Sequence, residues 1–153
     1  MGKQRAIVLD VDGVILNSAF LFDEIFQLGL KGNEMWDYFH KHCNSDKVKL
    51  IPNFYDLYVS LYSMAESINA KIVLLTSRNE SVKEETKVKL RKEGIFYDEL
   101  YMRPNTDYRE ASILKKETLQ ELLNKYNIIM YIDDDLKNCE AAKELGIYSL
   151  RKV

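Results

Sequence analysis

Acidic residues gather at two places in the sequence, each at the end of a short apolar run that is typical of a buried strand. Asp10 and Asp12 follow the first run, and three successive aspartates, residues 133–135, follow the other. In an open parallel sheet, ligands bind outside the carboxyl ends of the strands, where the strand order reverses. The sequence therefore predicts that the two acidic clusters meet in one cleft.

Carboxylates that lie close together repel one another unless a cation lies between them. An oxygen-only ligand set with few carboxylates suits Mg²⁺, which keeps several waters and shares its ligands with phosphate groups. We therefore expect Mg²⁺ as the cofactor of this cleft.

Hydroxyl-bearing and positively charged residues also occur at or near predicted strand ends. Thr76, Ser77 and Arg78 lie at the carboxyl end of the second predicted strand, and Lys115 lies near the start of the helix after the third. A hydroxyl, backbone N–H groups and an ammonium would together hold a phosphoryl group. A carboxylate can act as a covalent nucleophile, and a second acid two residues away can donate and accept the proton. This combination is typical of phosphoryl transfer to an aspartate.

The elements that position these residues alternate between apolar strands and amphipathic helices, which predicts an α/β fold with a parallel sheet. The predicted strands cover 6–10, 71–76, 99–103, 128–133 and 147–150. Ser81 and Glu84 form a capping-box pattern that opens a helix, and Gly94 is expected to end it. Asp135 is expected to cap the helix that follows the last acidic cluster.

About 60 residues separate the first two predicted strands, several times the length of a simple crossover helix. Aromatic and aliphatic residues recur there at helical spacing, which predicts two or three amphipathic helices forming a small cap. We therefore expect one domain over residues 1–153, with a core of 1–16 and 70–153 and a helical cap insert of about 17–69.

Composition supports one globular domain without a membrane partner. The 153 residues are 46% hydrophobic, and 22 basic against 24 acidic residues give a net charge of −2. This balance lacks the basic footprint of a dedicated nucleic-acid binder. No apolar run approaches the roughly 18 residues needed to span a bilayer, and residues 1–5 lack the pattern of a signal peptide. A cytoplasmic location is the expectation.

Four motifs in sequence order resemble those of haloacid dehalogenase (HAD) superfamily phosphatases. The first is DVDGVI at 10–15, the second is Thr76, the third is Lys115, and the fourth is IDDDLKNCEAAKELGI at 132–147. The resemblance implies a Rossmann-like three-layer sandwich with a five-stranded parallel sheet in the order 3-2-1-4-5. It also implies a substrate-selecting cap after the first motif.

The resemblance further implies roles for individual residues. Asp10 matches the nucleophile and Asp12 the general acid and base, while Thr76 and Lys115 match the other two catalytic positions. Asp10, Asp12 and Asp134 are the expected metal-site residues, and Asp133 competes with Asp134 for the downstream ligand position. The main-chain carbonyl of Val11 would complete the metal site.

A narrower resemblance links LLTSRNES at 74–81 and YMRPNTDYREASILKKETL at 101–119 to the phosphatase part of polynucleotide kinase-phosphatases. On this match Arg78 and Arg109, together with Ser77, would contact the phosphate or its surroundings. Arg78 is equally a candidate salt-bridge partner for the acidic cleft. Ala111 and Ser112 replace an acidic pair that this group tends to carry, and no P-loop pattern of a kinase half is present.

These observations predict a Mg²⁺-dependent phosphomonoester hydrolase that acts through an aspartyl-phosphate. A small phosphorylated metabolite or a nucleotide is the leading substrate class, because a cap should restrict access. Removal of a 3′-phosphate from DNA or RNA ends is the enzymatic alternative. A non-catalytic module that binds Mg²⁺ or phosphate is the alternative from another class.

Overall fold

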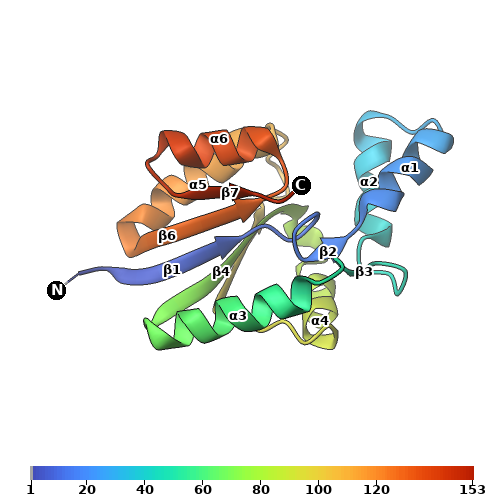
Figure 1. Cartoon of the computed structure of the whole chain (residues 1–153). Helices are drawn as coiled ribbons and strands as arrows, with labels where there is room; N and C mark the ends of the chain where they lie inside the picture. The colour runs from blue at the N-terminus through green and yellow to red at the C-terminus, as the bar shows by residue number, and fades with distance from the viewer. Residues whose placement is uncertain (1) are drawn as a thin grey trace.

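Five parallel strands form the centre of the computed structural model, which describes residues 2–153 (Figure 1). They are β1 Gln4–Leu9, β4 Ala70–Asn79, β5 Glu99–Arg103, β6 Tyr126–Asp133 and β7 Ser149–Arg151. The sheet order is β5-β4-β1-β6-β7, and each neighbouring pair is parallel. Numbered among themselves, these strands have the predicted order 3-2-1-4-5, so the fold prediction is confirmed. β1 is central, and the strand order reverses on either side of it.

Apolar side chains cover both faces of this sheet, because alternate residues of each strand point in opposite directions. Ile7 and Leu9 of β1 belong to the hydrophobic cluster beneath α3 and α4. Ala6 and Val8 belong to a second cluster with α5 and α6. Figure 1 shows the two helix pairs on opposite faces of the sheet. This arrangement explains why the strands read as nearly continuous apolar runs.

The helices begin and end at local signals in the sequence. Their bounds are α1 Ala19–Gln27, α2 Gly32–His42, α3 Phe54–Ser67, α4 Lys83–Lys92, α5 Ala111–Lys125 and α6 Leu136–Glu144. Asp135 caps α6 as predicted, since its side chain accepts hydrogen bonds from the N–H groups of Lys137 and Asn138. The predicted capping box at Ser81 is wrong: Asn79 accepts the Ser81 N–H instead and starts a short 3₁₀ helix, Glu80–Val82, before α4.

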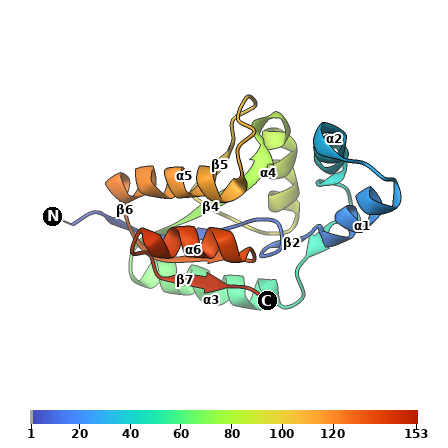
Figure 2. The ribbon, with the colours of Figure 1, turned by 90° about the horizontal axis from the view of Figure 1, so that it is seen from above.

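The segment between β1 and β4 divides into two parts. α1 and α2 project beyond the carboxyl ends of the strands, whereas α3 runs along one face of the sheet (Figures 1 and 2). α3 buries an apolar stripe at helical spacing, formed by Phe54, Tyr58, Leu61 and Ala65. Two short antiparallel strands, β2 Leu16–Asn17 and β3 Lys49–Leu50, join the projecting helices to the core. The expected cap range of 17–69 therefore includes one helix that packs on the sheet.

No helix within residues 2–153 combines the length and the apolar composition needed to cross a membrane.

Replacing Leu74 by Ala tests the packing beneath α3. Leu74 is fully buried in β4, so Leu74→Ala should lower the free energy of unfolding by about 3 kcal/mol in urea denaturation. Leu57→Ala is the matched control: Leu57 lies on α3 with 45% of its surface exposed and should change stability by less than about 0.5 kcal/mol. Equal losses in the two variants would contradict the assigned orientation of α3.

Candidate active site

The two acidic clusters meet because β1 and β6 are neighbours in the sheet. Asp10 directly follows β1, and its N–H donates to the carbonyl of Ile132 in β6 at 2.9 Å. Asp133 ends β6 and Asp134 follows it. Carboxylate oxygens of Asp10, Asp133 and Asp134 all lie within 4.8 Å of one another. The predicted meeting of the clusters at the carboxyl edge is therefore observed.

Lys115 lies between two of these carboxylates. Its Nζ donates to Oδ1 of Asp10 at 2.9 Å and to Oδ2 of Asp133 at 2.8 Å. Lys115 and Asp10 are only 3% and 5% exposed. Burial lowers the pKa of Lys115, but both carboxylates raise it by more, so the ammonium stays charged. α5 thereby places one fixed positive charge beside Asp10.

The neighbouring carboxylates respond differently to burial. Burial raises the pKa of Asp10 well above its usual value, and Lys115 opposes the rise. Burial acts in the same direction on Asp133, but there Lys115 outweighs it and the pKa is lowered. A further cation beside Asp10 would favour its ionised form.

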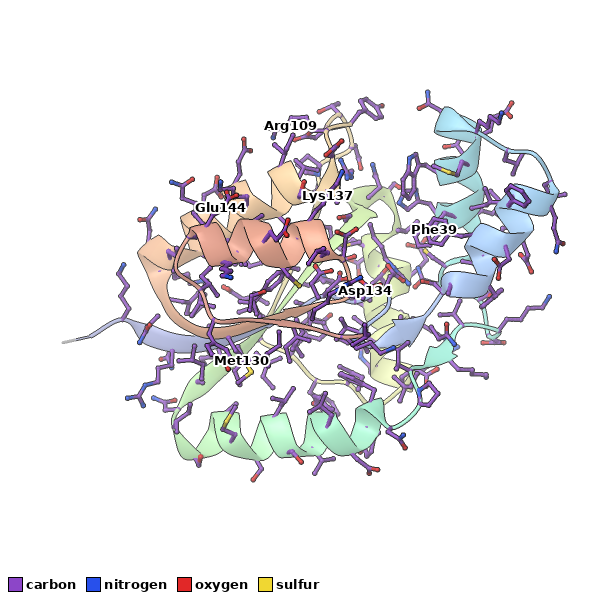
Figure 3. The ribbon with its side chains drawn as sticks, turned by 45° about the horizontal axis from the view of Figure 1, so that its top comes forward. Phe39, Arg109, Met130, Asp134, Lys137 and Glu144 are labelled. Atoms are coloured by element: carbon purple, nitrogen blue, oxygen red, sulfur yellow. The ribbon has the colours of Figure 1, made fainter. Side chains whose placement is uncertain are left out.

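Asp133 and Asp134 have contrasting surroundings. Asp133 is fully buried and accepts hydrogen bonds from Lys115, the Tyr131 hydroxyl, Asn138 Nδ2 and the N–H of Asp135. Asp134 is exposed, and Figure 3 shows it beyond the carboxyl ends of the strands. Four donors already surround Asp133, whereas Asp134 is exposed to solvent. The sequence left Asp133 and Asp134 as alternatives for the downstream metal ligand, and the structure shows that their environments differ.

The acidic cluster fits a divalent cation. Three ionised carboxylates and one ammonium sum to −3 + 1 = −2, which an ion of charge +2 would neutralise. The donor atoms are all oxygen, as Mg²⁺ prefers. Gly13 also has a positive φ of +85°, and a Cβ there would lie 2.0 Å from Oδ2 of Asp134. Only glycine leaves room for Asp134 in this position.

Asp12 faces a different cation, although it is two residues from Asp10. Its carboxylate accepts from Arg78 Nε at 2.8 Å and from the second guanidinium nitrogen at 2.7 Å, forming a bidentate pair. Ser18 Oγ also donates to Asp12 at 2.8 Å. Arg78 is 1% exposed, so the pair is largely withdrawn from water. Arg78 therefore forms a salt bridge with Asp12, which is one of the two roles that the sequence suggested for it.

Thr76 and Ser77 lie next to this pair near the carboxyl end of β4. Thr76 is buried, and its Oγ1 accepts from the N–H of Arg78 at 3.1 Å. The Ser77 Oγ is buried and has no hydrogen-bond partner among residues 2–153. Ser77 also lines the cleft described next.

A cleft of about 930 Å³ leads to this region. Its walls are α2, the end of β4, the loop between β5 and α5, and the start of α6, and residues lining it include Trp36, Ser77, Arg103, Tyr108, Arg109 and Asn138. Arg109 pairs with both Asp107 and Glu117, which partly neutralise it. Figure 3 shows Arg109 in the β5–α5 loop and Lys137 at the start of α6. This volume suits a ligand of nucleotide size.

Sequence reasoning did not find several residues that shape the site. The Tyr131 hydroxyl donates a hydrogen bond to Asp133, which lies two positions later on β6. Residues i and i+2 of a strand lie on the same face, so the spacing of these two residues was a signal in the sequence. Arg103 lines the cleft and donates to the main-chain carbonyls of Ser77, Asp107 and Arg109. Asn44 contacts Arg78 from the loop after α2, and no local pattern marks it.

Gly13→Ala tests the proposed metal site. The new Cβ would displace the Asp134 carboxylate, so Mg²⁺ affinity measured by calorimetry should fall by about tenfold or more. Gly146→Ala is the matched control, because Gly146 also has a positive φ, of +77°, but its Cβ would meet no atom within 4 Å. Both variants should lose roughly 1 kcal/mol or more of stability through backbone strain. Unchanged Mg²⁺ affinity in Gly13→Ala would contradict the placement of the site.

Structural comparisons find relatives with the same fold. A chain from the Pnkp1/Rnl/Hen1 RNA repair complex is 24% identical, with a TM-score of 0.74 over 98% of this chain and 42% of that chain. A class C acid phosphatase from Bacillus anthracis with tungstate bound is 17% identical, with a TM-score of 0.64 over 97% of this chain and 68% of that one. A haloacid dehalogenase-like hydrolase from Streptococcus pneumoniae is 16% identical, with a TM-score of 0.68 over 99% and 85% of the two chains.

The chain spans 42% of the length of that repair-complex chain and 47% of a chain from a second structure of the Pnkp1/Rnl/Hen1 complex. No curated protein matches it in sequence. A family model does match, however, over residues 1–151: HAD superfamily, subfamily IIIB (Acid phosphatase). This match favours an enzyme over a non-catalytic binding module. The chain therefore belongs to the subfamily IIIB acid phosphatases of the HAD superfamily.

Proposed function

We propose that this chain is a phosphatase that hydrolyses phosphomonoesters through a covalent phosphoryl group on Asp10. The contact between Lys115 Nζ and Asp10 Oδ1, at 2.9 Å in a buried setting, is the observation that supports this most directly. A buried ammonium holds the carboxylate in one orientation and stabilises negative charge that develops beside it. The exposed Asp134 and the open cleft lie on the side from which a phosphate group would arrive.

In the first step an Asp10 oxygen attacks phosphorus, and the bond to the leaving oxygen breaks. Asp12, which must carry a proton at this step, donates it to that oxygen, so the product leaves as a neutral alcohol. Asp12 then accepts a proton from water, whose oxygen attacks the same phosphorus. The phosphorus–oxygen bond to Asp10 breaks, inorganic phosphate forms, and both carboxyl groups return to their initial states.

Asp10 and Asp134 are the proposed carboxylate ligands of Mg²⁺. The Val11 carbonyl, expected from the sequence as a further ligand, instead accepts hydrogen bonds from the N–H groups of Ile15 at 2.8 Å and Leu16 at 2.9 Å. The ion, when bound, would neutralise the charge of the phosphate and of the two carboxylates. Asp133 has a different proposed role: it holds Lys115 and stays saturated with hydrogen bonds. Thr76 and Ser77 would bind phosphate oxygens at the end of β4.

Replacing the nucleophile tests the covalent mechanism. Asp10→Asn should lower kcat/KM for an aryl phosphate by at least about 1000-fold, because the amide does not form the phosphoryl intermediate. Mass spectrometry of acid-quenched wild-type enzyme should detect one phosphoryl group on the peptide that carries Asp10. Asp46→Asn is the control, since Asp46 is exposed in the loop before β3. Full activity in Asp10→Asn would refute the mechanism.

The leading substrate proposal is a small phosphorylated metabolite or nucleotide. α2 forms one wall of the cleft, and the volume of about 930 Å³ suits such a ligand. Removal of a 3′-phosphate from nucleic-acid ends is the second candidate. It is favoured by the likeness to a chain of an RNA repair complex and by the exposed rings of Trp36 and Tyr108, on which bases could stack.

A matched substrate panel separates these two candidates. The kcat/KM values of 3′-phosphorylated and 5′-phosphorylated oligonucleotides would be measured beside a nucleoside 3′-monophosphate and several sugar phosphates. We expect the small substrates to be hydrolysed at least as efficiently as either oligonucleotide. A preference of about tenfold or more for the 3′-phosphorylated oligonucleotide over the 3′-mononucleotide would establish the second candidate instead. Trp36→Ala should then reduce activity only on substrates that contain a base.

A further inference from the structure

The loop after α2 reaches into the core and contacts Arg78. Oδ1 of Asn44 accepts from one terminal guanidinium nitrogen at 2.6 Å, and the carbonyl of Cys43 accepts from the other at 3.1 Å. Thr86 Oγ1 of α4 is a further acceptor at 3.3 Å. The segment that carries the projecting helices therefore also surrounds the cation that holds Asp12.

Each of the five N–H groups of Arg78 has an acceptor. The Nε–H and one N–H of the second terminal nitrogen bind Asp12, and the other N–H of that nitrogen binds Cys43. The first terminal nitrogen binds Asn44 and Thr86. A guanidinium is planar and rigid, so fixing one edge fixes the orientation of the opposite edge. The contacts to Asn44 and Thr86 thus set the direction in which Arg78 presents its Asp12-binding edge.

The amide of Asn44 is itself oriented. Its Nδ2 donates to Thr86 Oγ1 at 3.2 Å, which turns Oδ1 toward Arg78. Thr86 is fully buried, so this hydrogen bond is shielded from water. A series of hydrogen bonds therefore connects Thr86 through Asn44 and Arg78 to Asp12. The bond between Arg78 and Asn44, at 2.6 Å, is the shortest of those that Arg78 donates in this series.

We propose that Asn44 is a positioning residue for the proton transfer performed by Asp12, and that it acts through Arg78. The inference rests on the proposed function, in which Asp12 protonates the leaving oxygen. Without Asn44 the guanidinium loses its closest acceptor and can rotate, and the Asp12 carboxylate rotates with it. The inserted segment then contributes to catalysis in addition to forming a wall of the cleft.

The dependence of rate on the leaving group tests this inference. A p-nitrophenolate ion leaves without a proton, whereas an alkoxide must be protonated as it leaves. The need for a well-placed acid therefore increases with the basicity of the leaving oxygen. Asn44→Ala should lower kcat/KM by about tenfold or more for ethyl phosphate and by less than about threefold for p-nitrophenyl phosphate. A series of aryl phosphates with increasingly basic leaving groups should show a graded loss between these limits.

Thr86→Val keeps the side-chain volume nearly constant and removes the hydroxyl that orients Asn44. It should lower the ratio of kcat/KM on ethyl phosphate to kcat/KM on p-nitrophenyl phosphate, as Asn44→Ala does, but by a smaller factor. Asn124→Ala, on the exposed face of α5, is the control and should leave the ratio unchanged. A merely structural effect would reduce the number of active molecules, so activity on every substrate would fall by the same factor. Equal losses on ethyl and p-nitrophenyl phosphate in Asn44→Ala would therefore overturn the inference.

Asp12→Asn separates this inference from the proposed function. It should change the ratio in the same direction as Asn44→Ala, and by more, because the acid is removed altogether. If Asp12→Asn leaves the ratio unchanged, the acid role of Asp12 is wrong and the inference fails with it. If Asp12→Asn changes the ratio and both Asn44→Ala and Thr86→Val leave it unchanged, the proposed function stands and only the role of Asn44 is refuted.

Discussion

The rest of the site depends on one buried interaction, the ammonium of Lys115 between the carboxylates of Asp10 and Asp133. It joins α5 to the ends of β1 and β6, and thus brings three distant parts of the chain to one point. Removing one member would leave an unpaired buried charge, which typically costs about 3–5 kcal/mol. Tyr131 and Asn138 add hydrogen bonds to Asp133, so the geometry around Lys115 is held from several sides.

Charge is divided between two separate units at the carboxyl edge of the sheet. With all three carboxylates ionised, the unit around Lys115 carries an excess of two negative charges, which fits a divalent cation. The second unit pairs Asp12 with Arg78 and is neutral within itself while Asp12 is ionised. In that state a cation bound near Asp10 need not share its charge with Asp12. Two aspartates two residues apart can therefore have different tasks.

The projecting helix α2 forms one wall of the cleft at this edge and carries Trp36. The loop after α2 also supplies Asn44 and the Cys43 carbonyl to Arg78. α3, which comes later in the chain, instead covers the sheet. A single insertion between the first two strands of the sheet thus provides a wall of the cleft, contacts to the Asp12–Arg78 pair and, with α3, part of one helical layer of the fold.

Local signals in the sequence determined the strands and the positions of Asp10 and Asp133 at strand ends, because apolar runs and turn residues act over short distances in the chain. The strand order followed from the resemblance to the HAD superfamily. The sequence also determined the cap at Asp135, which depends on residues within one helical turn. Only the tertiary structure decided that α3 packs on the sheet, that Arg78 pairs with Asp12, and that Asp133 is enclosed while Asp134 is open. These outcomes depend on contacts between residues far apart in the chain, such as Asn44 with Arg78, whose spacing in sequence carries no information about their distance in space.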